Sequence, residues 1–173
     1  LYSARLDGGG VVELGQICDV FNLAPNNDSV VFAGQTVLGA PCELFSTPIA
    51  GGELTRLNRP LNSSTSWAPI TSQLQRTNRL LMTPNGKYVF YLADHDTDNM
   101  FELYQAATDG SGVRKVSGPL VQAGNVMLEV ALSPDGQTIL YRADADRDEK
   151  YELYAAPVGE NTGQQLYLPH VEK

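Results

Sequence analysis

The stretch SPDGQTILYRADADRDEKYELY at residues 133–154 decides the fold, because TPNGKYVFYLADHDTDNMFELY at residues 83–104 repeats it fifty residues earlier. A weaker copy begins at Ala24 and reaches Phe45. Repetition at a period of about 40–50 residues is typical of stacked supersecondary units. The chain is therefore predicted to be an array of similar units.

Each copy is predicted to hold four short β-strands. The first two strands are joined at a Pro-Asn-Gly or Pro-Asp-Gly sequence, in which Pro fixes one turn angle and Gly supplies a positive φ. No helical periodicity appears, so the predicted fold class is all-β, with four-stranded antiparallel blades of a β-propeller. The expected strands are 21–23, 30–33, 44–47 and 55–58, then 80–82, 88–92, 103–106 and 114–117, then 130–132, 138–142, 152–156 and 165–168.

The chain is predicted to contain about three and a half blades. Residues 1–15 match only the last two strands of a blade, and blades are expected at 16–61, 62–120 and 121–173, the second with an insertion before its first strand. Propellers need about four blades to close, and open strand edges invite pairing. We therefore expect either a segment of a longer propeller, which is favoured, or several chains that complete one another.

The combination Ser-Pro-Asp-Gly, Ile-Leu-Tyr, Ala-Asp-x-Asp and Glu-Leu-Tyr resembles the TolB-like, WD-related propeller repeat of bacterial envelope and secreted proteins. The resemblance covers nearly the whole chain. It implies an extracellular or periplasmic scaffold or protein-interaction module. Because such blades also occur in prolyl-oligopeptidase-like enzymes, a regulatory propeller domain of a larger hydrolase stays open, as does a self-assembling extracellular building block.

Composition limits the function classes. The formal net charge of -8 disfavours nucleic-acid binding, which depends on Lys and Arg. No apolar run approaches the roughly 20 residues that span a membrane. The two cysteines, Cys18 and Cys42, would form one disulfide in an oxidising compartment, but the sequence leaves their pairing open.

The loops between the second and third strands carry alternating carboxylates, which suggest calcium as a cofactor, since Ca²⁺ prefers six to eight oxygen ligands. The loop at Asn99 is the better candidate, because Asn adopts left-handed backbone angles more readily than Glu149. The alternative is that the aspartates form local turns and ion pairs. The candidate ligands are Asp94, Asp96, Asp98 and Glu102, with Asp144, Asp146, Asp148 and Glu152, and the carbonyls of Met100 and Lys150.

The first copy argues that the glutamate is structural. It keeps Glu43 but has Gly34, Thr36 and Leu38 where the aspartates are expected. The glutamate is therefore predicted to serve the scaffold, for instance by bonding a neighbouring blade.

A partner-binding surface is predicted around the insertion at 59–79. Ser64, Thr65 and Trp67 are expected to share one rim with His95 of the acidic loop, because tryptophans and loop insertions are enriched at binding sites. Trp67 capping the gap between two blades is the alternative. The acidic neighbours of His95 are predicted to raise its pKa.

The repeated apolar positions Phe32, Tyr91, Tyr141, Leu44, Leu103 and Leu153 are predicted to form the core between blades. The sequence has no Gly-x-Ser-x-Gly, no His-Glu-x-x-His and no phosphate-binding loop, so an enzyme is not expected.

Overall fold

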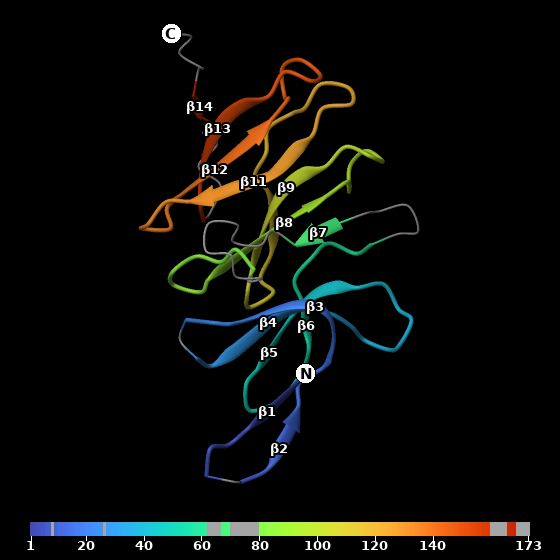
Figure 1. Cartoon of the computed structure of the whole chain (residues 1–173), viewed down its shortest axis with the longest axis vertical. Helices are drawn as coiled ribbons and strands as arrows, with labels where there is room; N and C mark the ends of the chain where they lie inside the picture. The colour runs from blue at the N-terminus through green and yellow to red at the C-terminus, as the bar shows by residue number, and fades with distance from the viewer. Residues whose placement is uncertain (8, 26, 62–66, 70–79, 160–165, 169–173) are drawn as a thin grey trace.

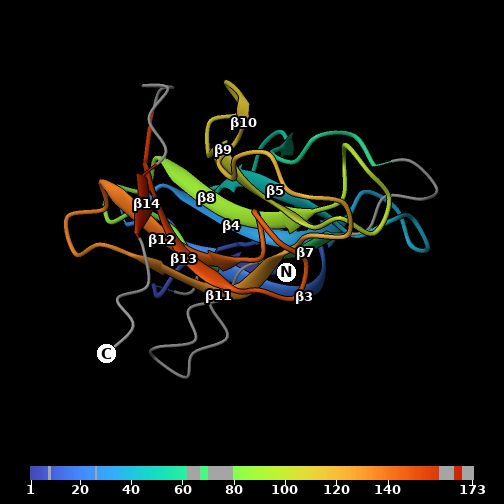
Figure 2. The same ribbon diagram turned by 90° about the horizontal axis from the view of Figure 1, so that it is seen from above.

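The computed structural model describes the chain except residues 8, 26, 62–66, 70–79, 160–165 and 169–173. Its described part is all-β and antiparallel, which confirms the predicted fold class. Figure 1 shows the sheets following one another along the long axis, in chain order from the N-terminal hairpin to the last sheet, and Figure 2 shows the same stack from above. The described residues include no helix that could cross a membrane.

Within the described residues, fourteen strands form one hairpin and three four-stranded sheets, which we call the N-terminal hairpin, blade 1, blade 2 and blade 3. The hairpin consists of β1 (Tyr2–Ala4) and β2 (Val11–Glu13). Blade 1 consists of β3 (Gln16–Leu23), β4 (Ser29–Gln35), β5 (Glu43–Pro48) and β6 (Thr55–Arg56). Blade 2 has β7 (Trp67–Pro69), β8 (Tyr88–Ala93), β9 (Glu102–Ala107) and β10 (Val113–Lys115). Blade 3 has β11 (Val126–Leu132), β12 (Thr138–Ala143), β13 (Glu152–Pro157) and β14 (Leu166–Leu168).

The register between the two middle strands fixes which residues are equivalent. Phe32 pairs with Phe45 in blade 1, as Tyr91 pairs with Tyr104 in blade 2 and Tyr141 with Tyr154 in blade 3. Counting from these pairs places Gln35 of blade 1 at the position of Asp94 and Asp144. The expected alignment of Gly34, Thr36 and Leu38 with the aspartates was therefore wrong by one residue.

The first strand of each blade is irregular. Its pairing shifts register between Ile17 and Phe21 in blade 1, and between Val126 and Val130 in blade 3. In blade 2 the corresponding strand starts at Trp67, and pairing resumes where Met82 bridges to Val89. The pairing of the first strand of blade 2 with β8 thus begins at Trp67, ahead of residues 70–79, and not only at Leu80 as predicted.

Apolar clusters fill the spaces between successive units. One face of a blade packs against the opposite face of the next, so Leu44 and Leu103 are fully buried. Five of the six predicted core positions are buried. The prediction for the sixth, Leu153, was wrong. Its side chain is 46% exposed, because no described unit covers this face of blade 3.

The turns between the first two strands also join the blades. Gly86 and Gly136 have φ of 71° and 72°, as the turn sequence predicts. A Cβ on Gly86 would lie 2.7 Å from the Cδ of Pro25, and one on Gly136 would collide with Pro84 in the same way. Each turn glycine therefore lies against the turn proline of the preceding blade.

Candidate functional site

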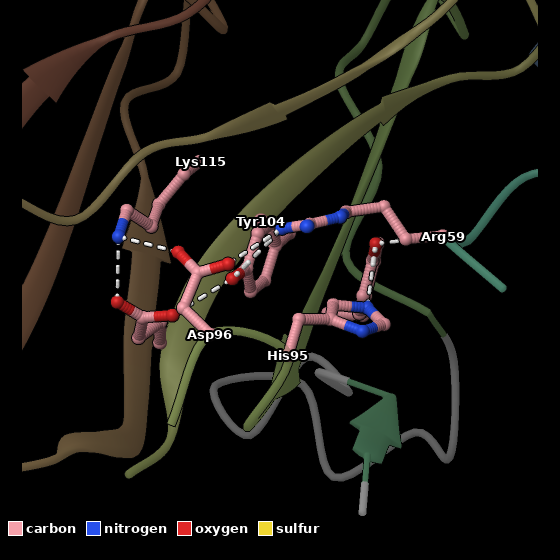
Figure 3. Close-up of polar contacts among 7 residues, drawn as sticks. Arg59, His95, Asp96, Tyr104 and Lys115 are labelled. Carbon is pink, nitrogen blue, oxygen red and sulfur yellow. Dashed lines mark hydrogen bonds and ion pairs between the residues drawn. The ribbon is translucent and has the colours of Figure 1, made fainter. Parts of the chain in front are cut away.

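A polar cluster lies beside the loop between β8 and β9, at the junction of blades 1 and 2. Arg59 follows β6 of blade 1, Lys115 ends β10, and the remaining members belong to β8, β9 and their loop. Figure 3 shows these side chains converging. The members are Arg59, Tyr91, His95, Asp96, Glu102, Tyr104 and Lys115.

Asp96 is the centre of the ion pairs in this cluster. It accepts a hydrogen bond of 2.9 Å from Nη1 of Arg59 and one of 2.8 Å from Nζ of Lys115, which also donates to Glu102 at 2.7 Å. The hydrogen bonds from Lys115 and then Arg59 lower the pKa of Asp96. Burial alone would lower the pKa of Lys115, but the hydrogen bonds to the two carboxylates outweigh it and raise that pKa. The charges of the cluster thus neutralise one another.

The aromatic rings form the other half of the cluster. Tyr91 and Tyr104 stack with centroids 5.4 Å apart, and His95 meets both rings edge-on. The Tyr104 hydroxyl donates to Glu102 at 2.8 Å, and the Arg59 guanidinium lies 5.7 Å from the Tyr104 ring centroid. Burial raises the pKa of Tyr91 to about 12. Burial, followed by the bond to Glu102, also raises the pKa of Tyr104. Both phenols therefore stay protonated at neutral pH.

His95 differs from its sequence prediction. It is half-buried against Tyr91 and Tyr104, and its pKa is lowered, first by burial and second by Arg59. Asp96, Asp94 and Glu102 act in the opposite direction but do not compensate. The prediction of a raised pKa was wrong, because the sequence shows the acidic neighbours of His95 but not the burial or the arginine that the fold brings to it.

The first residue of each acidic loop closes that loop. Asp94 accepts from the backbone N–H of Asn99 at 3.0 Å, and Asp144 accepts from that of Glu149 at the same distance. Asn99 and Glu149 both have positive φ, 62° and 61°, so Glu149 adopts the conformation that the sequence analysis assigned preferentially to Asn. In blade 1 the equivalent residue, Gln35, also closes its loop, but as a donor. Its side-chain amide donates a hydrogen bond of 2.7 Å to the carbonyl of Ala40.

The repeated glutamate forms an ion pair in every blade. Glu102 pairs with Lys115, and its counterparts Glu43 and Glu152 pair with Arg56 at 3.5 Å and Lys150 at 3.0 Å. Each of these cations belongs to the same blade as its glutamate. The glutamate thus has the structural role expected, but within its own blade instead of toward a neighbour.

Calcium binding by the loops stays a prediction. Asp98, Asp146 and Asp148 are exposed, while Asp94, Asp144, Glu102 and Glu152 are buried and engaged as described. The backbone N–H groups of Met100 and Lys150 donate to the carbonyls of Thr97 and Arg147, respectively. The two residues whose carbonyls were expected to bind calcium therefore each end a hydrogen-bonded turn. Among the described residues, no three His, Cys, Asp or Glu side chains gather as a metal site would require.

Trp67 lies at the same junction as the polar cluster. Its indole N–H donates to the carbonyl of Cys42 in blade 1, and its ring meets Tyr91 edge-on at 6.2 Å. Cys42 forms a disulfide with Cys18, with Cα atoms 6.3 Å apart. Trp67 therefore caps the gap between two blades, which was one of its two predicted roles. Ser64 and Thr65, predicted to share the partner surface, lie outside the described residues.

A groove of about 610 Å³ between blades 2 and 3 was missed by the sequence analysis. Val126 stands in it at the position that Trp67 holds in blade 2, since Val126 pairs with Ala143 as Trp67 pairs with Ala93. A comparison of these two positions could have revealed it, but the insertion in blade 2 hides their equivalence. The groove is lined by Leu92, Asn99, Phe101, Asn125, Val126, Met127, Leu128 and Glu129.

Comparisons with solved structures find chains that are similar to this one. TolB from Acinetobacter baumannii superposes with a TM-score of 0.54 at 15% identity, over 96% of this chain and 36% of that one. A putative TolB from Agrobacterium tumefaciens matches at 12% identity and a TM-score of 0.36, over 96% and 74% of the two chains. A Mycobacterium tuberculosis puromycin-hydrolyzing peptidase matches at 16% identity and a TM-score of 0.49, over 86% and 22%.

No family model and no curated protein matches the chain. The chain spans about a third of the length of the Acinetobacter protein. At these identities the likeness concerns the fold.

Proposed function

Because the chain has a TolB-like β-propeller fold, we propose that it is a non-catalytic scaffold that presents a protein-binding surface. The observation that carries this proposal is the groove between blades 2 and 3. Its walls include the apolar side chains of Leu92, Phe101, Val126 and Leu128, and among the described residues that line it Glu129 is the one ionisable group. Such a lining suits an apolar anchor of a partner better than it suits acid–base chemistry.

The polar cluster supports a scaffold role. Arg59, Lys115 and Glu102 are held in ion pairs, and His95 packs edge-on against the two stacked tyrosine rings. These contacts tie the segment that leaves blade 1 to the loop and last strand of blade 2. The cluster is therefore proposed to hold two blades together, and the protein is proposed not to be an enzyme.

We further propose that the protein works outside the cytoplasm, as a secreted or envelope protein. The Cys18–Cys42 disulfide supports this location, because disulfides persist in oxidising compartments.

The proposal is tested by site-specific photo-crosslinking in the cells that produce the protein. A benzophenone amino acid is placed at position 128 in the groove, at 96 in the polar cluster, at 153 on the outer face of blade 3 and at 38 in a blade 1 loop. A protein adduct of one defined mass from any of these positions supports the scaffold function, and the position identifies the surface. Absence of adducts from all four, together with hydrolysis of ester or peptide substrates by the purified chain, would contradict it.

Self-assembly is a second candidate, favoured by the exposed apolar side chains at both ends of the stack. Tyr2 and Val11 of the N-terminal hairpin are 64% and 70% exposed, and Leu153 lies on the outer face of blade 3. An uncovered blade face favours association with another one. Sedimentation velocity at rising protein concentration checks this, and Leu153→Glu should abolish any association seen.

A further inference from the structure

We propose that the groove between blades 2 and 3 binds an aromatic side chain of a protein partner, and that basic residues flank this side chain in the partner. The inference rests on the proposed function as a protein-binding scaffold and names the chemistry of the partner. It follows from the difference between two equivalent junctions in the same molecule, which have Trp67 in one and Val126 in the other at the same position.

Trp67 fills the junction between blades 1 and 2. It packs into the apolar cluster of that junction, touches Tyr91 edge-on, and donates its indole N–H to the carbonyl of Cys42. The ring thus reaches from the first strand of blade 2 to the loop of blade 1 that contains Cys42. The chain itself shows here which kind of side chain the junction accommodates.

The junction between blades 2 and 3 has no ring at the position of Trp67, which Val126 holds there. Phe101 is the counterpart of Cys42, since each precedes the repeated glutamate, and its carbonyl accepts from the backbone N–H of Val126 at 2.8 Å. Val126 is the counterpart of Trp67 and is far smaller. The groove of about 610 Å³ opens at this position, within the range of about 300–1,000 Å³ typical of ligand sites.

The residues that line the groove favour an apolar side chain of the partner. Leu92 is buried at the base of the groove, Phe101 is half-buried, and Leu128 is 49% exposed at the rim. A partner's aromatic ring would cover Leu128 and exclude water from these walls. Large aromatic side chains bury about 150–250 Å² each and are frequent anchors of interfaces.

The charged residues around the groove favour basic residues next to the aromatic side chain in the partner. Glu129 lines the groove with a side chain that is 65% exposed, and the adjacent loop exposes Asp96 and Asp98. Arg142 offsets Glu129 at 3.5 Å, and Arg59 and Lys115 offset Asp96, so the negative charge that Asp98 adds beside the groove is the local excess among these residues, in a chain of net charge -8. Complementary charge favours Lys or Arg beside the anchor and speeds their encounter.

The test uses three peptides: acetyl-Lys-Trp-Lys-amide, acetyl-Lys-Ala-Lys-amide and acetyl-Glu-Trp-Glu-amide. Each is titrated into the ¹⁵N-labelled chain, and binding is followed by amide chemical shifts. We expect Lys-Trp-Lys to shift the amides of Leu92, Phe101, Val126 and Leu128, and to bind at least about fivefold more tightly than either other peptide. Shifts at these positions separate the groove from any other apolar surface.

The matched variants are Leu128→Ser in the groove and Leu38→Ser in a blade 1 loop, where Leu38 is 89% exposed. Both remove an exposed leucine, so neither should disturb the core, and thermal unfolding checks this. Leu128→Ser should weaken Lys-Trp-Lys binding about fivefold or more, and Leu38→Ser should leave it unchanged.

Equal binding of Lys-Ala-Lys and Lys-Trp-Lys, or shifts confined to other residues, would overturn the groove as the site. Equal binding of Glu-Trp-Glu would overturn the basic partner. Occupation of the groove by a second copy would appear as concentration-dependent association that Leu128→Ser abolishes, and it would also overturn the proposal. A crosslink from position 96, 153 or 38 without peptide binding would preserve the scaffold function while excluding this groove.

Discussion

Arg59 joins blade 1 to blade 2, because its Nη1 donates to the carboxylate of Asp96 across the blade boundary at 2.9 Å. Arg59 is the third residue after β6, so this contact restrains the segment that leads out of blade 1. Lys115 binds the other oxygen of Asp96 from the last strand of blade 2. One carboxylate therefore holds two blades at the point where the chain passes between them.

Replacing Asp96 by Asn should destabilise the protein by about 0.5–1 kcal/mol at pH 7. The loss is modest because all three side chains are more than a third exposed and solvent screens their attraction. The pKa of Asp96 is lowered in the folded state, so its contribution is present above the unfolded pKa of about 4 and is lost as the pH falls through the lower folded value. Urea unfolding at pH 7 and at pH 2–3 measures this. Asp98→Asn, an exposed change in the same loop, is the control and should cost less.

The stability of the protein should decrease as the pH falls below about 6.5, in part because of His95. Its pKa is lowered in the folded state, so protons bind the unfolded chain first and favour unfolding. The stabilisation is therefore complete above the unfolded pKa and is lost toward the folded one. NMR titration of the imidazole should give a pKa below the ordinary value. The variant His95→Phe keeps an aromatic ring beside Tyr91 and Tyr104, and it should flatten the change in melting temperature between pH 7.5 and pH 5. A measured pKa at or above 6.5 would contradict this.

Leucine-to-alanine changes at three equivalent positions should separate covered from uncovered blade faces. Leu44 and Leu103 are fully buried, so each substitution should cost about 2–5 kcal/mol. Leu153 is 46% exposed, and its substitution should cost about 1 kcal/mol or less. Denaturant unfolding of the three variants checks the order. A loss at Leu153 as large as at Leu103 would mean that the outer face of blade 3 is covered in solution.

Reduction of the Cys18–Cys42 disulfide should destabilise the protein by about 2–4 kcal/mol, because it frees a loop of the unfolded chain. Trp67 should report the change, since its indole donates to the carbonyl of Cys42. We expect its fluorescence to shift to longer wavelength on reduction. The double variant Cys18→Ala, Cys42→Ala should not respond to reductant, which makes it the control.

Calcium, if it binds the acidic loops, should raise the melting temperature by mass action. The variant Asp96→Asn, Asp98→Asn should remove that increase and leave the fold intact. Asp144 should behave differently, because it accepts hydrogen bonds from Glu149 and Asn125. Its replacement by Ala should destabilise the protein with or without calcium. Identical melting in excess Ca²⁺ and in EDTA would rule out calcium binding.

The regular parts of each blade could be predicted from the sequence, because they depend on local chemistry. Gly86 and Gly136 mark turns that need a positive φ, and the alternating apolar residues at Tyr91 and Tyr141 follow the period of a strand. The first strand of blade 2 was misplaced, since its pairing starts at Trp67, thirteen residues before Leu80. A bulge and an insertion leave no local pattern that distinguishes a broken strand from a loop.

The chemistry of the polar cluster could be predicted only in part. The carboxylates of Asp96 and Glu102 were recognised, but their cations come from Arg59 and Lys115, which lie 37 and 13 residues away along the chain. The protonation of His95 depends on the same long-range contacts. Residue spacing shows which groups repeat, whereas their partners depend on how strands from two blades meet.

The contact of each turn glycine with the proline of the preceding turn has a consequence for how such an array can grow. Gly86 rests on Pro25 and Gly136 on Pro84, so blade 2 carries both parts of this contact, Pro84 for blade 3 and Gly86 for blade 1, whereas blade 1 has Asn27 at the glycine position. A unit like blade 2, duplicated as a whole, brings a compatible contact on both sides. The number of units can then change by recombination without a new contact surface having to evolve between neighbouring units.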